Sequence, residues 1–146
     1  MPHRYDRAES ANLLLEASAI EFARHGVNGA RIDKIADRAG VNKASIYTYI
    51  GKKDELFEAA IERKLGELAN QVAIRSDDLP RYVADLFDFL CDNPIVAWLF
   101  EQEAFHFPAD GVPRFEERAA YFQSRVETVA RTLRRPRRWP GVSVRS

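Results

Sequence analysis

The amino-acid sequence predicts an all-α fold, and three observations support this prediction. Apolar residues recur at helical spacing over most of the 146 residues, as in the stripe Leu13, Leu14, Ala17 and Ile20. No stretch sustains the alternation of apolar and polar residues that a half-buried β-strand needs. Glycines, and Asp or Asn residues shortly before a proline, interrupt the periodicity where helices end and begin.

The first half divides into four helices that glycines separate. The first helix covers residues 7–25, and Gly26 is expected to close it in a left-handed conformation. Gly40 and Gly51 mark the later breaks. The next three helices are expected at residues 32–39, at residues 43–49 with Asn42 as N-cap, and from residue 54 to near residue 73.

Proline punctuates the second half. Pro80, after two aspartates, and Pro94, after Asn93, each suit the first turn of a helix. A loop rich in proline and glycine covers residues 107–113. The three helices of this half are expected from residue 79 through residue 90, from residue 94 to about residue 104, and from residue 114 to about residue 133.

Composition and charge exclude several classes of protein. Basic and acidic residues number 22 each, so net charge alone gives no argument for nucleic-acid binding. The single cysteine, Cys91, cannot form an intramolecular disulfide. No apolar run reaches the roughly 20 residues that span a bilayer, and the polar N-terminus lacks a secretory signal. We therefore expect a soluble, cytoplasmic protein that does not contact a membrane.

Enzyme chemistry is not indicated. The sequence lacks a glycine-rich phosphate loop, a serine–histidine–aspartate set and the ligand spacing of a zinc site. Glu103 and His106 have the spacing of one half of a di-iron site, but the second half is not evident. A solvated surface pair is the alternative for these two residues. We expect no catalytic residue, no metal and no cofactor.

Two short helices joined by Gly40 predict a helix-turn-helix. Ala36 is small where two crossing helices must approach closely, and Gly40 follows four residues later, where a tight turn needs positive φ. Ile46 comes six residues after Gly40 and can wedge between the helices, with Ile35 and Val41 adding apolar contact. This spacing makes the second short helix a candidate recognition helix.

The front of that helix carries residues suited to the edges of DNA bases. In a recognition helix the N-terminal residues enter the major groove, and here they are Lys43, Ala44 and Ser45. Lysine can donate to guanine acceptors, serine can bond to several bases, and the alanine methyl can touch a thymine methyl. We predict that these three residues read the DNA sequence.

Two tyrosines and a lysine follow at positions suited to the DNA backbone. The hydroxyls of Tyr47 and Tyr49 can reach phosphates on either side of the groove. Lys53 begins the next helix, where its ammonium and the free N–H groups both favour a phosphate. The alternative is that both tyrosines are half-buried packing residues with solvated hydroxyls. Beside the glycine turn and Lys53, we favour DNA contact.

Residues 7–64 resemble the N-terminal DNA-binding domain of the TetR family of transcriptional regulators. That pattern comprises a long first helix ending in phenylalanine and glycine, an isoleucine–alanine pair, alanine–glycine–valine, a tyrosine, and a lysine followed by a leucine. This chain supplies them as Phe22, Gly26, Ile35, Ala36, Ala39, Gly40, Val41, Tyr47, Tyr49, Lys53 and Leu56.

The resemblance implies a DNA-binding transcriptional regulator. It would be a repressor that binds double-stranded operator DNA as a homodimer and is released by a small-molecule effector. It adds Arg31, at the start of the second helix, to the expected DNA-backbone contacts. The expected parts are a DNA-binding domain at residues 1–56, an incomplete helical effector-binding and dimerisation domain at residues 57–133, and an irregular arginine-rich tail at residues 134–146.

The chain also departs from the family pattern. Ala30 stands where the family often has a threonine that caps the second helix, Ile50 replaces a usual phenylalanine, and Lys52 replaces a usual cap residue. Residues 131–146 contain six arginines and no acidic residue, and their prolines break any helical stripe. Such an end suggests a truncation, a shifted reading frame or an artificial boundary. A chain ending this way is expected to dimerise poorly.

The second half is rich in aromatic residues, and ordinary core packing is one explanation for them. The resemblance implies that this region lines a ligand cavity. The candidate ligand-binding residues are Phe87, Trp98, Phe105, Tyr121 and Phe122. Because no lysine follows Lys64, we expect an uncharged or weakly charged apolar effector, although four arginines could orient an acid: Arg81, Arg114, Arg118 and Arg125.

Two alternatives to a ligand-responsive repressor stay open. The chain could be a remnant that folds partly and regulates nothing, because the dimer interface is missing. It could also be a helical adaptor whose helix-turn-helix binds protein. A gel shift with DNA from beside the gene would separate the repressor from both alternatives.

Overall fold

The computed structural model describes residues 4–75, 77–107 and 115–134, and these residues form helices without any strand. The all-α prediction is therefore confirmed for the described part of the chain. The helices are α1 (Arg4–Gly29), α2 (Ile32–Ala39), α3 (Lys43–Tyr49), α4 (Lys53–Gln71), α5 (Leu79–Asp92), α6 (Pro94–His106) and α7 (Phe115–Arg134). The α2 and α3 bounds are those that the sequence predicts.

The first helix is interrupted at Gly26, where the sequence predicts its end, and a second helical segment continues α1 to Gly29. Gly26 has φ 66° and ψ 175°, and helical structure then resumes through Gly29. Both the positive φ and the break in the helix at Gly26 agree with the prediction, and the short helical segment that follows it was not predicted. A Cβ on Gly26 would lie 2.7 Å from Oε1 of Gln102, a residue of α6. Glycine at this position therefore leaves room for the end of the Gln102 side chain.

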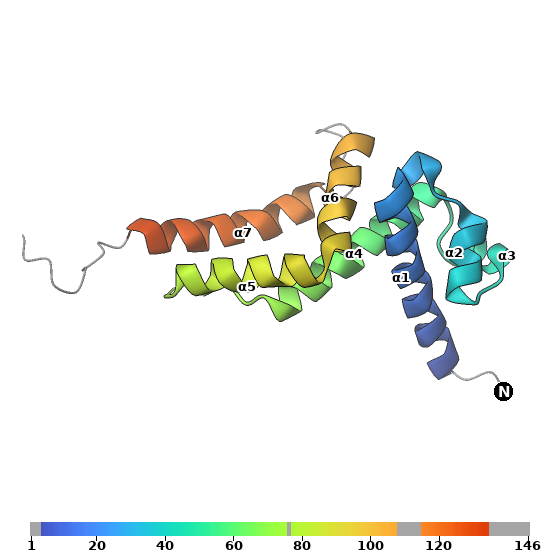
Figure 1. Cartoon of the computed structure of the whole chain (residues 1–146), viewed down its shortest axis with the longest axis horizontal. Helices are drawn as coiled ribbons and strands as arrows, with labels where there is room; N and C mark the ends of the chain where they lie inside the picture. Colours follow the sequence, from blue (N-terminus) through green and yellow to red (C-terminus); the bar gives the residue numbers. More distant parts are fainter. Residues whose placement is uncertain (1–3, 76, 108–114, 135–146) are drawn as a thin grey trace, which may run out of the picture.

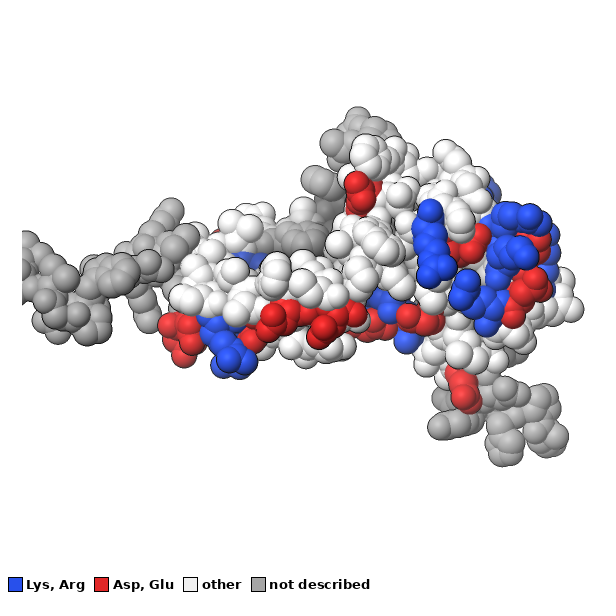
Figure 2. Space-filling model, viewed as in Figure 1, with Lys and Arg blue, Asp and Glu red and all other residues white. Residues whose placement is uncertain are grey.

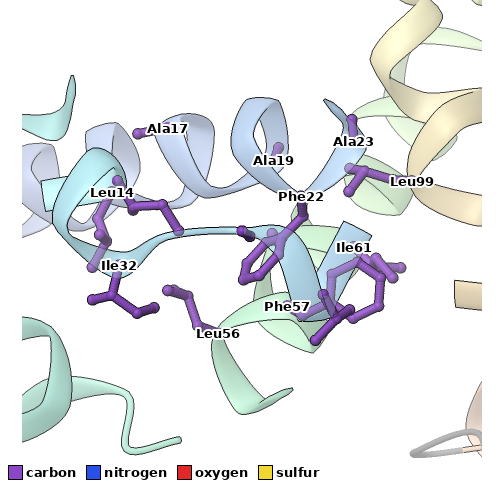
Figure 3. Packing of buried hydrophobic residues seen from close by; sticks show 14 of the residues in the cluster. Leu14, Ala17, Ala19, Phe22, Ala23, Ile32, Leu56, Phe57, Ile61 and Leu99 are labelled. Atoms are coloured by element: carbon purple, nitrogen blue, oxygen red, sulfur yellow. The ribbon is translucent and has the colours of Figure 1, made fainter. Parts of the chain in front are cut away.

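The larger core joins α1 to α2, α3 and α4. Phe22 of α1 and Phe57 of α4 are fully buried and meet edge to face, with ring centroids 5.1 Å apart. Ile46 of α3 is also buried in this core, as predicted for the residue that wedges between the two short helices. Leu99 projects from α6 toward the same core (Figure 3). In cores of this kind, truncating a Phe to Ala costs roughly 3–5 kcal/mol.

A smaller core lies beyond the larger one. It combines Leu68 and Val72, near the end of α4, with Tyr82 and Phe89 of α5 and Val96 of α6. Val129 of α7 packs against it, and the Arg125 guanidinium of α7 donates to the Tyr82 hydroxyl over 3.4 Å. Because α4 contributes to both cores, it links the two parts of the molecule.

The arrangement places the helix-turn-helix at one end of an elongated molecule. Figure 1 shows α2 and α3 beside α1 at that end, whereas α5 and α7 extend toward the other end. The expected domain boundary at residues 56/57 falls inside α4, which continues unbroken to Gln71. Apart from Arg134, which ends α7, the expected tail at residues 134–146 lies outside the described residues.

Candidate nucleic-acid interface

The turn between α2 and α3 has the geometry that its glycine permits. Gly40 adopts φ 68° and ψ 27°, in the left-handed region of backbone conformation that residues other than Gly and Asn rarely adopt. Its N–H donates to the Asp37 carbonyl at 3.3 Å, and the Val41 N–H donates to the Ala36 carbonyl at 3.1 Å. These two bonds form a Schellman motif, which ends α2 and redirects the chain into α3.

The start of α3 presents its side chains to solvent. Asn42 is the N-cap, as predicted, and its Oδ1 accepts the Ala44 N–H at 2.9 Å. Lys43 and Ala44 are exposed, and Ser45 is half-buried. Ile46 anchors α3 in the core, and Lys43 and Ala44 at its front stay exposed, so the front of α3 is free to enter a groove.

Of the two tyrosines of α3, the structure describes the side chain of Tyr47 but not that of Tyr49. The Tyr47 side chain is 51% exposed, which leaves it available to a DNA backbone. Thr48, next to it, is also exposed, and its hydroxyl donates to the Ala44 carbonyl at 3.0 Å within the helix. Tyr49 is the last residue of α3, but its side chain lies outside what the structure describes.

Lys53 occupies the first position of α4. The backbone N–H of its neighbour Lys52 donates to Glu55 Oε2 at 2.7 Å, so a glutamate supports the helix start where Lys52 itself offers no side-chain cap. The Lys53 ammonium donates to the Asn28 carbonyl at 3.3 Å. An ammonium carries three donors, so this bond orients Lys53 without exhausting its capacity to bind a phosphate.

The start of α2 corrects the expectation about its cap. The N-cap residue is Arg31, not Ala30, and neither side chain caps the helix. Instead, Oε1 of Glu21 on α1 accepts the Arg31 N–H at 3.2 Å. Glu21 is 6% exposed, an unusual environment for a carboxylate. A residue ten positions upstream thus provides the acceptor, and local sequence signals gave no indication of it.

The side chain of Arg31 is paired on the surface. Its Nη2 and Nε donate to the two carboxylate oxygens of Asp33 at 2.6 and 3.2 Å. Hydrogen bonding to Arg31 holds the pKa of Asp33 below its ordinary value, and the charge of Lys43 acts in the same direction. The hydrogen bond to Asp33 likewise raises the pKa of the Arg31 guanidinium. Asp33 was not among the predicted site residues, although it is two positions from Arg31.

The charged side chains are distributed unevenly over the surface. Figure 2 shows lysine and arginine gathered at the end of the molecule that carries α2 and α3, with some acidic side chains among them, whereas acidic side chains predominate along α5. Three basic candidate DNA contacts belong to helix starts: Arg31 is the N-cap residue of α2, Lys43 begins α3 and Lys53 begins α4. A chain of zero net charge therefore presents a locally basic surface to a partner.

The candidate ligand-binding aromatics whose side chains the structure describes are exposed. Phe87, Trp98 and Phe105 are 66%, 45% and 80% exposed. The side chains of Tyr121 and Phe122 lie outside what the structure describes. Aromatic density in the sequence does not distinguish core from surface positions, and the effector site stays a prediction.

The possible metal pair has a different environment from the one expected. Glu103 is buried, and His106 Nε2 lies 3.3 Å from Asp54 Oδ1 at the start of α4. The solvated pair proposed as the alternative is therefore wrong for Glu103. In the described part of the chain, no group of three or more His, Cys, Asp or Glu side chains could hold a metal ion. None of the described helices is long and apolar enough to cross a membrane.

Comparison with known proteins identifies the N-terminal part. Residues 14–60 match the model of a protein family described as bacterial regulatory proteins, tetR family. The HTH-type transcriptional repressor SCO4008 of Streptomyces coelicolor is 37% identical over 116 residues, which are 80% of this chain and 60% of that protein. The HTH-type transcriptional activator FasR of Mycolicibacterium smegmatis is 36% identical over 95 residues, which are 60% of this chain and 43% of FasR.

Solved structures show the same arrangement of helices. The crystal structure of SCO4942 from Streptomyces coelicolor superposes with a TM-score of 0.69 and 27% identity, over 84% of this chain and 65% of that one. A mutant of HlyIIR, 24% identical, shares the fold with a TM-score of 0.63 over 87% of this chain and 70% of its own. This chain spans 60% of the length of SCO4008. Its relatives are transcriptional regulators and not enzymes, and residues 14–60 of this chain carry the N-terminal domain of the tetR family of bacterial regulatory proteins.

Proposed function

We propose that this protein is a transcriptional repressor that reads operator DNA with α3. The tetR-family domain at residues 14–60 and the similarity to regulators of transcription support its being a DNA-binding regulator. The observation that carries the finer proposal is the exposed front of α3, Lys43 and Ala44, held out by the Gly40 turn and the Asn42 cap. Repression follows the similarity to SCO4008, which is a repressor.

The proposed contacts divide into two kinds. Lys43, Ala44 and Ser45 meet base edges, because the N-terminal turn of a recognition helix lies deepest in the major groove. The remaining contacts bind phosphates and fix the position of the helix without reading sequence. These backbone contacts are Arg31, Tyr47, Tyr49 and Lys53.

A homodimer is the proposed binding species, as the resemblance to the family implies, although this chain is expected to dimerise poorly. One helix of seven residues contacts too few bases for tight specific binding, whereas two copies joined in fixed geometry read two half-sites together. The operator is therefore expected to be a palindrome. A second copy would double the basic surface that faces the DNA.

An apolar small molecule is the proposed effector. Its proposed site lies among α5, α6 and α7, where Phe87, Trp98, Phe105, Tyr121 and Phe122 are the candidate residues. Effector binding would act on the helix-turn-helix through α6. This helix contacts both cores, since Val96 belongs to the smaller core and Leu99 to the larger one. In a thermal-shift screen, apolar compounds should stabilise the protein, and stabilisation by metals or nucleotides alone would contradict this assignment.

Selection from a random duplex library tests DNA reading. The purified protein is mixed with the library, and bound DNA is amplified over successive rounds. A repressor of this kind enriches one palindromic sequence, which it then binds more tightly than a shuffled duplex. If no sequence is enriched, the proposal fails, and the protein is instead a remnant or a protein-binding adaptor.

Transcription from a promoter that carries the enriched sequence then separates repression from activation. The comparison with FasR, an activator, makes this second measurement necessary. We expect lower transcription when the protein is present, because a protein bound over a promoter competes with polymerase. Increased transcription would make the protein an activator with the same DNA contacts.

A further inference from the structure

An acidic side chain lies among the cations that are proposed to bind DNA. Asp33 Oδ2 is 2.6 Å from Arg31 Nη2, and Asp33 Oδ1 is 3.2 Å from Arg31 Nε. Both side chains are exposed, at 65% for Arg31 and 40% for Asp33. One edge of the Arg31 guanidinium is thus hydrogen-bonded to Asp33, on the surface where the proposal places a DNA phosphate.

The same carboxylate also acts on the recognition helix. The charge of Lys43, the first residue of α3, contributes to the lowered pKa of Asp33. The Asp33 carboxylate is therefore ionised at neutral pH and lies within electrostatic reach of two candidate DNA contacts. A fixed negative charge in this place repels the phosphates that Arg31 and Lys43 attract.

We propose that Asp33 is a specificity-determining residue that restrains sequence-independent DNA binding by occupying the Arg31 guanidinium and repelling backbone phosphates. This inference rests on the proposed function, since it concerns the same DNA-facing surface. Asp33 itself makes no base contact in the proposal. It acts through Arg31, and it sets how much of the affinity comes from phosphates alone.

The effect differs between operator and random DNA for a geometric reason. On the operator, base contacts fix one register, so an Arg31 side chain already held by Asp33 loses little freedom when its remaining donors meet a phosphate. That gain offsets the repulsion. Random DNA offers many registers, in which fixed geometry brings no advantage and the repulsion remains. Asp33 thus weakens random binding more than operator binding.

The test compares Asp33→Asn with Asp37→Asn. Asp37 is exposed on the same helix one turn later, so the control removes an equal charge without breaking the Arg31 pair. Binding is followed by fluorescence anisotropy with a random-sequence duplex and with the duplex that the wild-type protein enriches, over a series of salt concentrations. Circular dichroism confirms equal folding, which an exposed ion pair barely influences.

Asp33→Asn should tighten binding to the random duplex roughly fivefold, the factor implied by one unit-charge interaction at about 4 Å in water. Binding to the enriched duplex should tighten less than about twofold, since lost preorganisation offsets the gain. The salt dependence on random DNA should steepen by about one phosphate contact. When Arg31 is also replaced by Ala, Asp33→Asn and Asp37→Asn should change the affinity for the random duplex equally.

Equal effects of Asp33→Asn and Asp37→Asn would overturn the inference, as would an equal gain on both duplexes or a loss on random DNA. If the wild-type protein binds and Arg31→Ala weakens it while the two asparagine variants behave alike, only this inference fails. If the wild-type protein binds neither duplex, the proposed function and the inference fail together.

Discussion

The buried carboxylate of Glu21 connects α1 to the start of α2. Glu21 is 6% exposed and accepts the Arg31 N–H at 3.2 Å, in place of the side-chain cap that α2 lacks. Unsatisfied N–H groups at a helix start cost stability, and an acceptor there is also favoured by the helix dipole. Glu21 therefore stabilises α2 and fixes the backbone of Arg31, a candidate DNA contact.

Glu21→Leu should lower the free energy of unfolding by about 1–2 kcal/mol, because it removes the acceptor while filling the same space. Urea unfolding followed by circular dichroism measures the change. The matched control is Glu21→Gln, which keeps an oxygen at the same position and should lose less. If the leucine variant is as stable as the wild type, the Arg31 N–H does not need this acceptor.

Lys64 of α4 forms a second buried charge contact with α1. Its ammonium lies 2.7 Å from Glu16 Oε2 and 2.9 Å from Glu67 Oε2. Burial acts against the charged form of Lys64, but the hydrogen bonds to Glu16 and Glu67 outweigh it and raise the pKa above the ordinary 10.5. Because the pKa of Lys64 is higher in the folded than in the unfolded protein, its protonated form stabilises the fold.

Lys64→Met should therefore cost about 1 kcal/mol at neutral pH, a small value because the Glu16 side is solvated and screened. The advantage of the wild type should be complete below pH 10.5 and should vanish as the pH rises through the raised pKa. Urea unfolding at a series of alkaline pH values measures it. Lys34→Met, on the exposed face of α2, is the control that should show no such trend. A constant difference at every pH would contradict this explanation.

At the scale of the elements, local signals predicted the helix-turn-helix well. The bounds of α2 and α3 follow from Gly40 and Asn42, which act within a few residues of themselves. The approach of the Gln102 side chain to Gly26 could not be predicted in this way, because Gln102 lies far along the chain. Glu21 and Asp33 were missed because sequence shows neither burial nor pairing. The exposure of Phe87 likewise depends on which neighbours α5 acquires in the fold.

Gly40→Ala should lower the free energy of unfolding by about 1–2 kcal/mol, since φ of 68° is unfavourable for a residue with a side chain. A Cβ there would meet no atom within 4 Å, so the cost is one of backbone conformation alone. Gly66 offers the opposite case inside α4, also with open space around its Cβ. Gly66→Ala should stabilise by about 0.5–1 kcal/mol. Thermal unfolding of both variants measures these changes in stability. If both substitutions stabilise or both destabilise the protein, the explanation from backbone conformation is contradicted.

The whole molecule is organised around α4 and α6. Both helices contribute to the two cores, and α6 ends where His106 meets Asp54 and Phe107 stacks on Phe57. Asp54 directly follows Lys53, a candidate phosphate contact. A displacement of α6 would therefore reach the start of α4 through contacts that already exist, which is what the proposed effector requires.

The central claim is that α3 reads DNA sequence through Lys43. Binding of the wild type and of Lys43→Ala is measured by anisotropy on the enriched duplex, on each of its single base-pair variants and on a shuffled duplex. The variant should lose about 1–3 kcal/mol on the enriched duplex and its preference at one base pair of each half-site, while preferences elsewhere stay. An equal loss on the enriched and shuffled duplexes would show that Lys43 contacts only phosphates, and would contradict the assignment of α3 as the reading helix.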